Sequence, residues 1–275
     1  MAIQHRAKKR FGQNFLSDPG IIQRIIQSIN PKPGERLIEI GPGLGALTCP
    51  ILKIAGEMDV IELDRDIVPK LQLNCGLNYS SENKLRIHNV DVLNFDFAGL
   101  KYEQDLRIIG NLPYNISTPI IFHLVEHCKI IQDMFFMLQK EVVDRLAAKS
   151  NTSNYSRLSV MAQYHFMITP LFLVPPESFE PIPKVDSAIV RLIPHTEKPV
   201  KVNDEKEFAK LVRISFSQRR KTLRNVLKET CTTAQIEQAG IDPSVRAQSL
   251  TLQQFADLHN CLTENTQLSP IIEQK

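Results

Sequence analysis

Short apolar runs alternate along the first half of the chain with segments whose apolar residues recur at helical spacing, and this alternation constrains the fold strongly. The runs have the length of buried strands, and the segments between them are long enough for crossover helices. Strands and helices in succession indicate right-handed βαβ units and a parallel sheet. The expected strands cover residues 36–40, 58–62, 85–88, 106–109 and 134–138, with helices at 44–54 and 120–126 among the segments between them.

The rest of the chain has a different pattern. Residues 166–174 and 187–192 read as two further strands, and the proline-rich segment 175–183 joins them, so we expect an antiparallel edge to the same sheet. Helical patterns dominate after residue 198. The expected fold is therefore a doubly wound, Rossmann-like α/β sheet over residues 1–195, followed by a small helical domain over residues 196–275.

Composition places the chain among ordinary globular proteins. Its 275 residues, 43% of them hydrophobic, suffice for an α/β core with a smaller second domain. No apolar run reaches the ~20 residues that span a bilayer, and no signal-peptide core is evident, so we expect a cytoplasmic protein without membrane contact. The cysteines are odd in number and lack a CxxC pair, which favours reduced packing residues over disulfides or a zinc site. They are Cys49, Cys75, Cys128, Cys231 and Cys261.

A glycine-rich loop follows the first expected strand directly. Without side chains at Gly41, Gly43 and Gly45, the backbone can turn tightly and approach a ligand. The GxGxG spacing, with Glu39 two residues before the first glycine, differs from the GxGxxG of dinucleotide-binding proteins and suits a cofactor without a pyrophosphate. S-adenosylmethionine fits that description. A glycine loop by itself also leaves an NAD-dependent enzyme open.

Two acidic residues follow the next two strands. Glu62 lies about twenty residues beyond the loop, where a carboxylate can accept hydrogen bonds from both hydroxyls of a ribose. Asp91 follows the third strand, where it could meet the amino group of an adenine. Acids at such strand ends often serve only as surface caps, so this pair supports a cofactor site only together with the glycine loop.

The sharpest chemical feature is the turn that ends the fourth strand, Asn111-Leu112-Pro113-Tyr114. The N6 amine of adenine is a poor nucleophile because its lone pair is delocalised into the ring, so an enzyme must accept hydrogen bonds from its N–H groups. The Asn111 side-chain oxygen and a main-chain carbonyl of the turn, made rigid by Pro113, supply two acceptors. Tyr114 offers a flat face for an unstacked purine. The alternative is a proline turn with a packed tyrosine.

Five segments make the chain resemble the bacterial ribosomal RNA adenine dimethyltransferases of the kasugamycin-resistance type over nearly its whole length. They cover residues 9–16, 39–45, 111–114, 181–188 and 216–223. The one departure is Ser217, where a glycine is expected. The resemblance implies a class I methyltransferase fold with S-adenosylmethionine as cofactor. It also implies dimethylation of N6 on two adjacent adenosines in the 3′-terminal hairpin of 16S ribosomal RNA, within the assembling 30S subunit.

The same resemblance implies roles for individual residues. Asn111 should bridge the cofactor and the target base, and Phe179 should lie opposite Tyr114, so that a flipped adenine is held between two rings. The residues implied for catalysis are Asn111, Leu112, Pro113, Tyr114 and Phe179. Those implied for cofactor binding are Gln13, Asn14, Leu16, Gly41, Gly43, Gly45, Glu62, Asp91 and Asn111.

Positive charge is unevenly distributed. The segment 213–228 carries six Lys or Arg residues and no acid, and further basic residues lie within the first ten positions. Charge alone fits a solvated helix face as well as a polyanionic partner, whereas the resemblance favours RNA. On a single helix Arg219 would fall on the apolar side, so a break near Ser217 is the alternative to one basic stripe. The expected RNA-binding residues are Arg219, Arg220, Lys221, Arg224 and Lys228.

Three rival interpretations stay open at this level. His123-Leu124-Val125-Glu126-His127 matches the HxxEH pattern of zinc peptidases, although no convincing third ligand follows and we expect no metal. The turn at Asn111 reports the base and not the polymer, so a methyltransferase of large-subunit RNA or of DNA adenine would share it. A ribosome-assembly or transcription factor could keep the fold and use binding alone, but intact Glu62 and Asp91 speak against lost catalysis. No protein partner can be identified.

Overall fold

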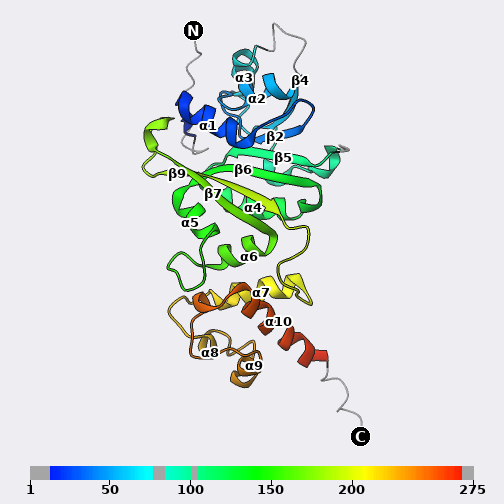
Figure 1. Cartoon of the computed structure of the whole chain (residues 1–275), viewed down its shortest axis with the longest axis vertical. Coiled ribbons are helices and arrows are strands. Elements are labelled where there is room, and N and C mark those ends of the chain that lie inside the picture. Colours follow the sequence, from blue (N-terminus) through cyan, green and yellow to red (C-terminus); the bar gives the residue numbers. More distant parts are fainter. Residues whose placement is uncertain (1–12, 77–83, 101–103, 268–275) are drawn as a thin grey trace. The chain divides into compact units, whose positions relative to one another are not determined.

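A computed structural model describes residues 13–76, 84–100 and 104–267 (Figure 1). The chain divides into two compact units. The first combines Met1–Val143 with Met167–Pro194, and the second combines Asp144–Phe166 with His195–Lys275. No helix among the described residues is long and apolar enough to cross a membrane.

The first unit contains a seven-stranded sheet (Figure 1). Its strands are β2 (Arg36–Ile40), β3 (Glu57–Ile61), β4 (Lys84–His88), β5 (Leu106–Asn111), β6 (Ile131–Gln139), β7 (Phe166–Val174) and β9 (Ser187–Pro194). Their order is β4-β3-β2-β5-β6-β9-β7. The first five are parallel and β9 is antiparallel to β6. The expected parallel sheet with an antiparallel element at one side is confirmed.

Burial explains why these segments form strands. Ile38, Val60 and Ile108 in the three central strands are 0% exposed, and nearly every residue of β2, β3 and β5 is buried. Strands covered on both faces have continuous apolar runs, which is the pattern in this sequence. The strand order reverses between β2 and β5, and such switch points are where open α/β sheets bind ligands at the carboxyl ends of their strands.

The helices of the first unit begin at recognisable signals. Asp18 caps α1 by accepting the backbone N–H groups of Gly20 and Ile21, and Pro19 occupies the first helical position. Two short strands, β1 (Phe15–Leu16) and β8 (Phe179–Glu180), pair in a separate antiparallel ribbon. The helices are α1 (Pro19–Ile29), α2 (Thr48–Ala55), α3 (Val68–Asn74), α4 (Ser117–Val125) and α5 (Lys140–Leu146), the last of which continues into the second unit.

The second unit is helical, as expected, but it contains more of the chain than the expected residues 196–275. Asp144–Phe166 belongs to it, so the expected boundary at residue 195 marks only one of the crossings. The physical reason is packing, since the ring of Tyr164 lies 5.2 Å from that of the fully buried Phe208. Its helices are α6 (Arg157–His165), α7 (Glu205–Ser215), α8 (Leu223–Val226), α9 (Thr233–Gln238) and α10 (Leu252–Gln267).

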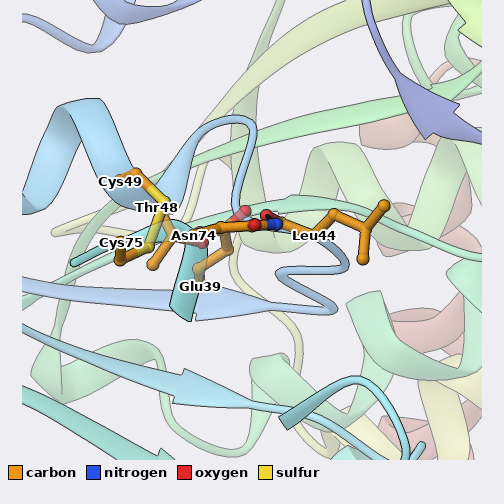
Figure 2. Close-up of a disulfide and its surroundings, with 6 residues drawn as sticks. All are labelled: Glu39, Leu44, Thr48, Cys49, Asn74 and Cys75. Carbon is orange, nitrogen blue, oxygen red and sulfur yellow. Dashed lines mark hydrogen bonds between the residues drawn. A yellow bond between two sulfur atoms is a disulfide. The ribbon is translucent and has the colours of Figure 1, made fainter. Parts of the chain in front are cut away.

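The expectation that every cysteine is reduced is wrong for two of them. Cys49 and Cys75, 26 positions apart, form a disulfide (Figure 2). Their meeting follows from the parallel sheet, because α2 and α3 start from the neighbouring strands β2 and β3 and bring the first turn of one helix beside the end of the other. Cys128, Cys231 and Cys261 are thiols, as expected.

Candidate active site

A cavity of about 850 Å³ opens at the carboxyl ends of β2, β3 and β5. Its volume is in the range of small-molecule sites, and all of its lining residues belong to the first unit. Gly45 does not line it and instead lies against Cys49 and Cys75 behind the loop. The expected residues that do line it are Gln13, Asn14, Leu16, Gly41, Gly43, Glu62, Asp91, Asn111, Leu112, Pro113 and Tyr114.

The glycine loop forms one wall of the cavity. Gly41, Gly43 and Gly45 all have positive φ angles, which residues other than glycine rarely adopt. A Cβ atom at Gly43 would lie 3.1 Å from the ring of Phe15, so the loop and β1 approach each other closely. The N–H of Gly41 donates to the Ile61 carbonyl at 2.9 Å, which fixes the loop to the end of β3.

Glu62 sits at the end of β3 with 7% of its surface exposed. Its carboxylate accepts the Asp64 backbone N–H at 2.7 Å. Burial raises its pKa, and hydrogen bonds from the Asp64 and Gly43 backbones oppose that shift. The neighbouring Asp64 accepts a hydrogen bond of 3.1 Å from Gln13, which ties the segment before β1 to the same edge of the cavity.

Asp91 both caps a turn and lines the cavity. One of its oxygens accepts the Leu93 backbone N–H at 3.0 Å and so begins a 3₁₀ turn, η2 (Val92–Asn94). The apolar side chains of Val90, Val92 and Leu93 line the cavity beside it. This arrangement offers a flat ligand an apolar slot with one carboxylate at its edge.

Glu39 also lines the cavity, although the sequence pattern indicated it only as a neighbour of the glycine loop and not as a site residue. It is 2% exposed and accepts the Thr48 hydroxyl at 2.6 Å. Burial raises its pKa to about 7 against the opposing Thr48 hydrogen bond, with the negative Glu62 adding to the rise. The sequence signal that could have identified Glu39 as a site residue is an acidic residue between two apolar ones within the buried strand β2. Glu39 and Glu62 together place two buried carboxyl groups at the cavity, which suits a cation, and S-adenosylmethionine carries both a sulfonium and an ammonium group.

Asn111 is the last residue of β5, and its side chain has a defined orientation. The amide nitrogen donates to the Asn14 backbone carbonyl at 3.0 Å. Because a carbonyl can only accept, the nitrogen must face Asn14, and the amide oxygen is then the atom left to accept from another N–H group. The next carbonyls of the turn are engaged, since Pro113 accepts from the Ile116 N–H at 3.1 Å and Tyr114 from the Ser117 hydroxyl at 3.4 Å.

Tyr114 lines the cavity with a half-buried side chain. Its hydroxyl forms a hydrogen bond of 2.8 Å with the hydroxyl of Ser187, the buried first residue of β9. Burial raises the tyrosine pKa, and the hydrogen bond with Ser187 opposes that shift. The ring is thereby held at both ends, by the backbone of the turn and by β9.

Phe179 does not lie where the resemblance implied. Its side chain is 2% exposed, packs in the main core and is absent from the cavity lining, which Glu180 and Pro181 reach instead. The reason is its pairing with Leu16 in the β1–β8 ribbon, which turns Phe179 towards the core. In this structure Tyr114 therefore has no aromatic partner from Phe179 across the cavity.

The five expected RNA-binding residues are all exposed. The segment 213–228 does not form a single helix: α7 ends at Ser215 and α8 begins at Leu223. Arg219 donates a hydrogen bond to the Ser153 carbonyl, and Lys228 pairs with Glu229 at 3.4 Å. The alternative of charges spread over a loop and a helix start is thus confirmed over the single stripe. The basic residues within the first ten positions lie outside the described residues.

The HxxEH segment lies in and just after α4. His123 forms a hydrogen bond of 3.1 Å with the Phe95 carbonyl, and the His127 ring lies 5.2 Å from that of Phe97. Both histidines therefore have structural partners. Within residues 13–76, 84–100 and 104–267, no group of three or more His, Cys, Asp or Glu side chains is placed to hold a metal ion.

Sequence comparison identifies relatives along almost the full chain. A family model described as ribosomal RNA adenine dimethylase matches residues 4–264. The ribosomal RNA small subunit methyltransferase A of Pseudomonas aeruginosa is 53% identical over 262 residues, which cover 95% of this chain and 96% of the relative. The protein of the same name from Vibrio parahaemolyticus is 52% identical over 266 residues, 96% of this chain and 97% of the relative.

Solved structures agree with the sequence relatives. A dimethyladenosine transferase from Plasmodium falciparum has a TM-score of 0.73 at 28% identity and covers 89% of this chain and 95% of its own. The 23S rRNA methyltransferase ErmE has a TM-score of 0.68 at 24% identity, with 91% of this chain and 100% of its own covered. This second likeness concerns the fold, which is that of a class I methyltransferase.

Proposed function

Because the chain belongs to the ribosomal RNA adenine dimethylase family, we propose that it dimethylates N6 of two adjacent adenosines in the 3′-terminal hairpin of 16S ribosomal RNA, within the assembling 30S subunit in the cytoplasm. Membership makes the chain an S-adenosylmethionine-dependent enzyme that acts on adenine in ribosomal RNA. The observation that carries the proposed transfer to the N6 amine of adenine is the oriented amide of Asn111 at the cavity. The relatives named for the small subunit support the 16S assignment.

The reaction depends on the target amine being made nucleophilic. The Asn111 amide oxygen accepts one N–H of the adenine amino group, and the Leu112 carbonyl is the proposed second acceptor because the carbonyls of Pro113 and Tyr114 already have partners. Two acceptors draw the nitrogen towards sp3 geometry and stabilise the positive charge that grows on it during transfer. The bound cofactor supplies the methyl group from a sulfonium, an intrinsically good donor. The chain's part is alignment and charge stabilisation, with no general base required.

Different residues of the cavity are the proposed partners of different parts of the cofactor. Glu62 is the proposed acceptor for the ribose hydroxyls, and Asp91 with its apolar slot the proposed site for adenine. Gln13, Asn14 and Leu16 close one side of the cavity from β1 and the residues before it. The buried Glu39 places a carboxyl group where a cationic ligand would be stabilised.

The target base enters beside Tyr114. A base removed from its stack loses its neighbours, and an aromatic face restores about 1–3 kcal/mol of stacking. The Ser187 hydrogen bond keeps that face in place. The exposed basic residues between Arg219 and Lys228 are the proposed partners of RNA phosphates.

The test is to incubate the protein with radiolabelled S-adenosylmethionine and 30S particles that lack the modification, and then to map the labelled nucleosides. The expected product is dimethyladenosine at two neighbouring positions near the 3′ end of 16S RNA. Asn111→Ala should lower this transfer by at least ~100-fold, the scale of removing one preorganised charge-stabilising group, with RNA binding retained. Label confined to 23S RNA or to DNA would overturn the substrate assignment, and equal losses of transfer and RNA binding would make Asn111 only structural.

A further inference from the structure

The Cys49–Cys75 disulfide, drawn in Figure 2, lies directly against Gly45 of the glycine loop. A Cβ atom at Gly45 would lie 2.6 Å from the Cys49 sulfur and 3.2 Å from the Cys75 sulfur. The backbone of Gly45 therefore rests on the bonded sulfur atoms. Two unbonded sulfur atoms need more room than a disulfide, so breaking this bond must displace the loop, the sulfurs or both.

Hydrogen bonds connect the residues next to the two cysteines to residues of the cavity (Figure 2). Asn74, next to Cys75, donates to the Leu44 carbonyl at 2.9 Å. Thr48, next to Cys49, donates to the Glu39 carboxylate at 2.6 Å. Leu44 and Glu39 both line the cavity. Each cysteine is therefore adjacent in sequence to a residue whose side chain forms a hydrogen bond with a residue that lines the cavity.

The disulfide also joins the two connections that form the proposed cofactor site. Cys49 lies in α2, which follows the glycine loop, and Cys75 directly follows α3, which comes after Glu62. In the reduced chain these connections would be held to each other by non-covalent contacts alone. In the oxidised chain they are fixed relative to each other.

Small reagents in solution can reach both cysteines. Each is partly exposed. Cys49 lies in the first turn of α2, where the partial positive charge of a helix start favours a thiolate, whereas Cys75 lies at the carboxyl end of α3, where the charge is of opposite sign. Cys49 is then the attacking thiol and Cys75 the resolving one.

We propose that Cys49 and Cys75 form a reversible thiol–disulfide site whose oxidation state controls the affinity of the cavity for S-adenosylmethionine. The oxidant is a low-molecular-weight disulfide. The Cys49 thiolate attacks one of its sulfurs, forms a mixed disulfide and releases one small thiolate. Cys75 then loses its proton and attacks the Cys49 sulfur, releasing the second small thiolate, so two protein thiols become one disulfide as the oxidant is reduced to two thiols.

The direction of the effect follows from preorganisation. The oxidised chain holds the glycine loop and the Glu62 connection in the arrangement that encloses the cavity, so the cofactor has less to order on binding. Reduction removes that constraint. The affinity for S-adenosylmethionine should fall on reduction by about 5-fold or more, the lower range of coupling between sites. This inference rests on the proposed cofactor site.

The experiment measures S-adenosylmethionine binding by calorimetry on the full-length protein, first oxidised with oxidised glutathione and then reduced with a phosphine. Peptide mapping without reductant follows the Cys49–Cys75 link in each sample. The wild type should bind at least about 5-fold more tightly when oxidised. Cys49→Ser and Cys75→Ser should each lose this dependence, whereas Cys128→Ser, which changes a partly exposed thiol of the same unit, should retain it.

The outcomes separate the two proposals. Equal affinities of the oxidised and reduced wild type would overturn the redox coupling and leave the cofactor site standing. A redox dependence that persists in Cys49→Ser, or a pair that oxidised glutathione never links, would also overturn it. An absence of binding in both states would instead overturn the cofactor site itself. The wild-type comparison needs no substitution, so a variant that fails to fold does not decide the result.

Discussion

Glu39 illustrates how one buried residue links the cavity to pH. Burial raises its pKa from the ordinary 4.5 to about 7. Between these values the folded chain binds a proton that the unfolded chain has released, so the free energy of unfolding should fall as pH rises from about 4.5 to 7, by up to about 3 kcal/mol. Glu39→Gln should flatten this part of the profile. Urea denaturation of the cofactor-free protein between pH 4.5 and 8 measures both slopes, and identical slopes would show that Glu39 does not titrate in this range.

Phe179 leads to a different prediction at the same scale. Because its ring is buried in the core, Phe179→Ala should leave a cavity and lower the free energy of unfolding by about 3–5 kcal/mol. Phe179→Leu keeps most of the apolar volume and should cost much less. Thermal and urea unfolding of the three proteins test this. Unchanged stability of Phe179→Ala together with a large loss of RNA turnover would restore the stacking role that the resemblance implied.

Among the elements, the central strands were predictable from the sequence to within a few residues. Ile38, Val60 and Ile108 lie in strands buried on both faces, and such strands must be short and apolar whatever surrounds them. The disulfide and the place of Phe179 were not predictable in this way. Both depend on which elements meet in space: Cys75 meets Cys49 through two neighbouring strands, and Phe179 turns inward because Leu16 pairs with it.

The basic segment 219–228, which runs from the loop after α7 through α8, carries a prediction about RNA. Replacing Arg220, Lys221 and Arg224 with alanine should weaken RNA binding, and each phosphate that is no longer neutralised should take about 0.7–0.9 from the slope of log affinity against log salt. A matched control replaces Lys201, Lys206 and Lys210, exposed lysines of the same unit outside this segment, and should leave the slope nearly unchanged. Filter binding to the 16S hairpin at several salt concentrations measures both. Equal slope changes in the two triple variants would indicate a general charge effect.

For the whole molecule, the spacing of apolar residues in the sequence predicted two units but did not assign every segment to the correct unit. Asp144–Phe166 contains a helix and the start of a strand, so nothing in its periodicity distinguishes it from the first unit. Its membership is set by side chains such as Tyr164, which packs on Phe208 more than forty positions away in sequence. Helical spacing reports which face of a segment is apolar, and the partner of that face is a property of the folded chain.

The two units should respond differently to the cofactor. All residues that line the cavity belong to the first unit, so S-adenosylmethionine at about 100 times its Kd should stabilise that unit by about 2.7 kcal/mol. Backbone amides at Ile38 and Val60, which exchange only when the central strands open, should then exchange about 100-fold more slowly. Amides at Val212 and Phe255, in the core of the second unit, should change little. Hydrogen exchange followed by mass spectrometry resolves these segments, and Glu62→Ala, with its ribose acceptor removed, is the control in which neither unit should be protected. Equal slowing in both units would mean that they unfold as one cooperative block, and slowing confined to the second would place the cofactor outside the cavity at β2, β3 and β5.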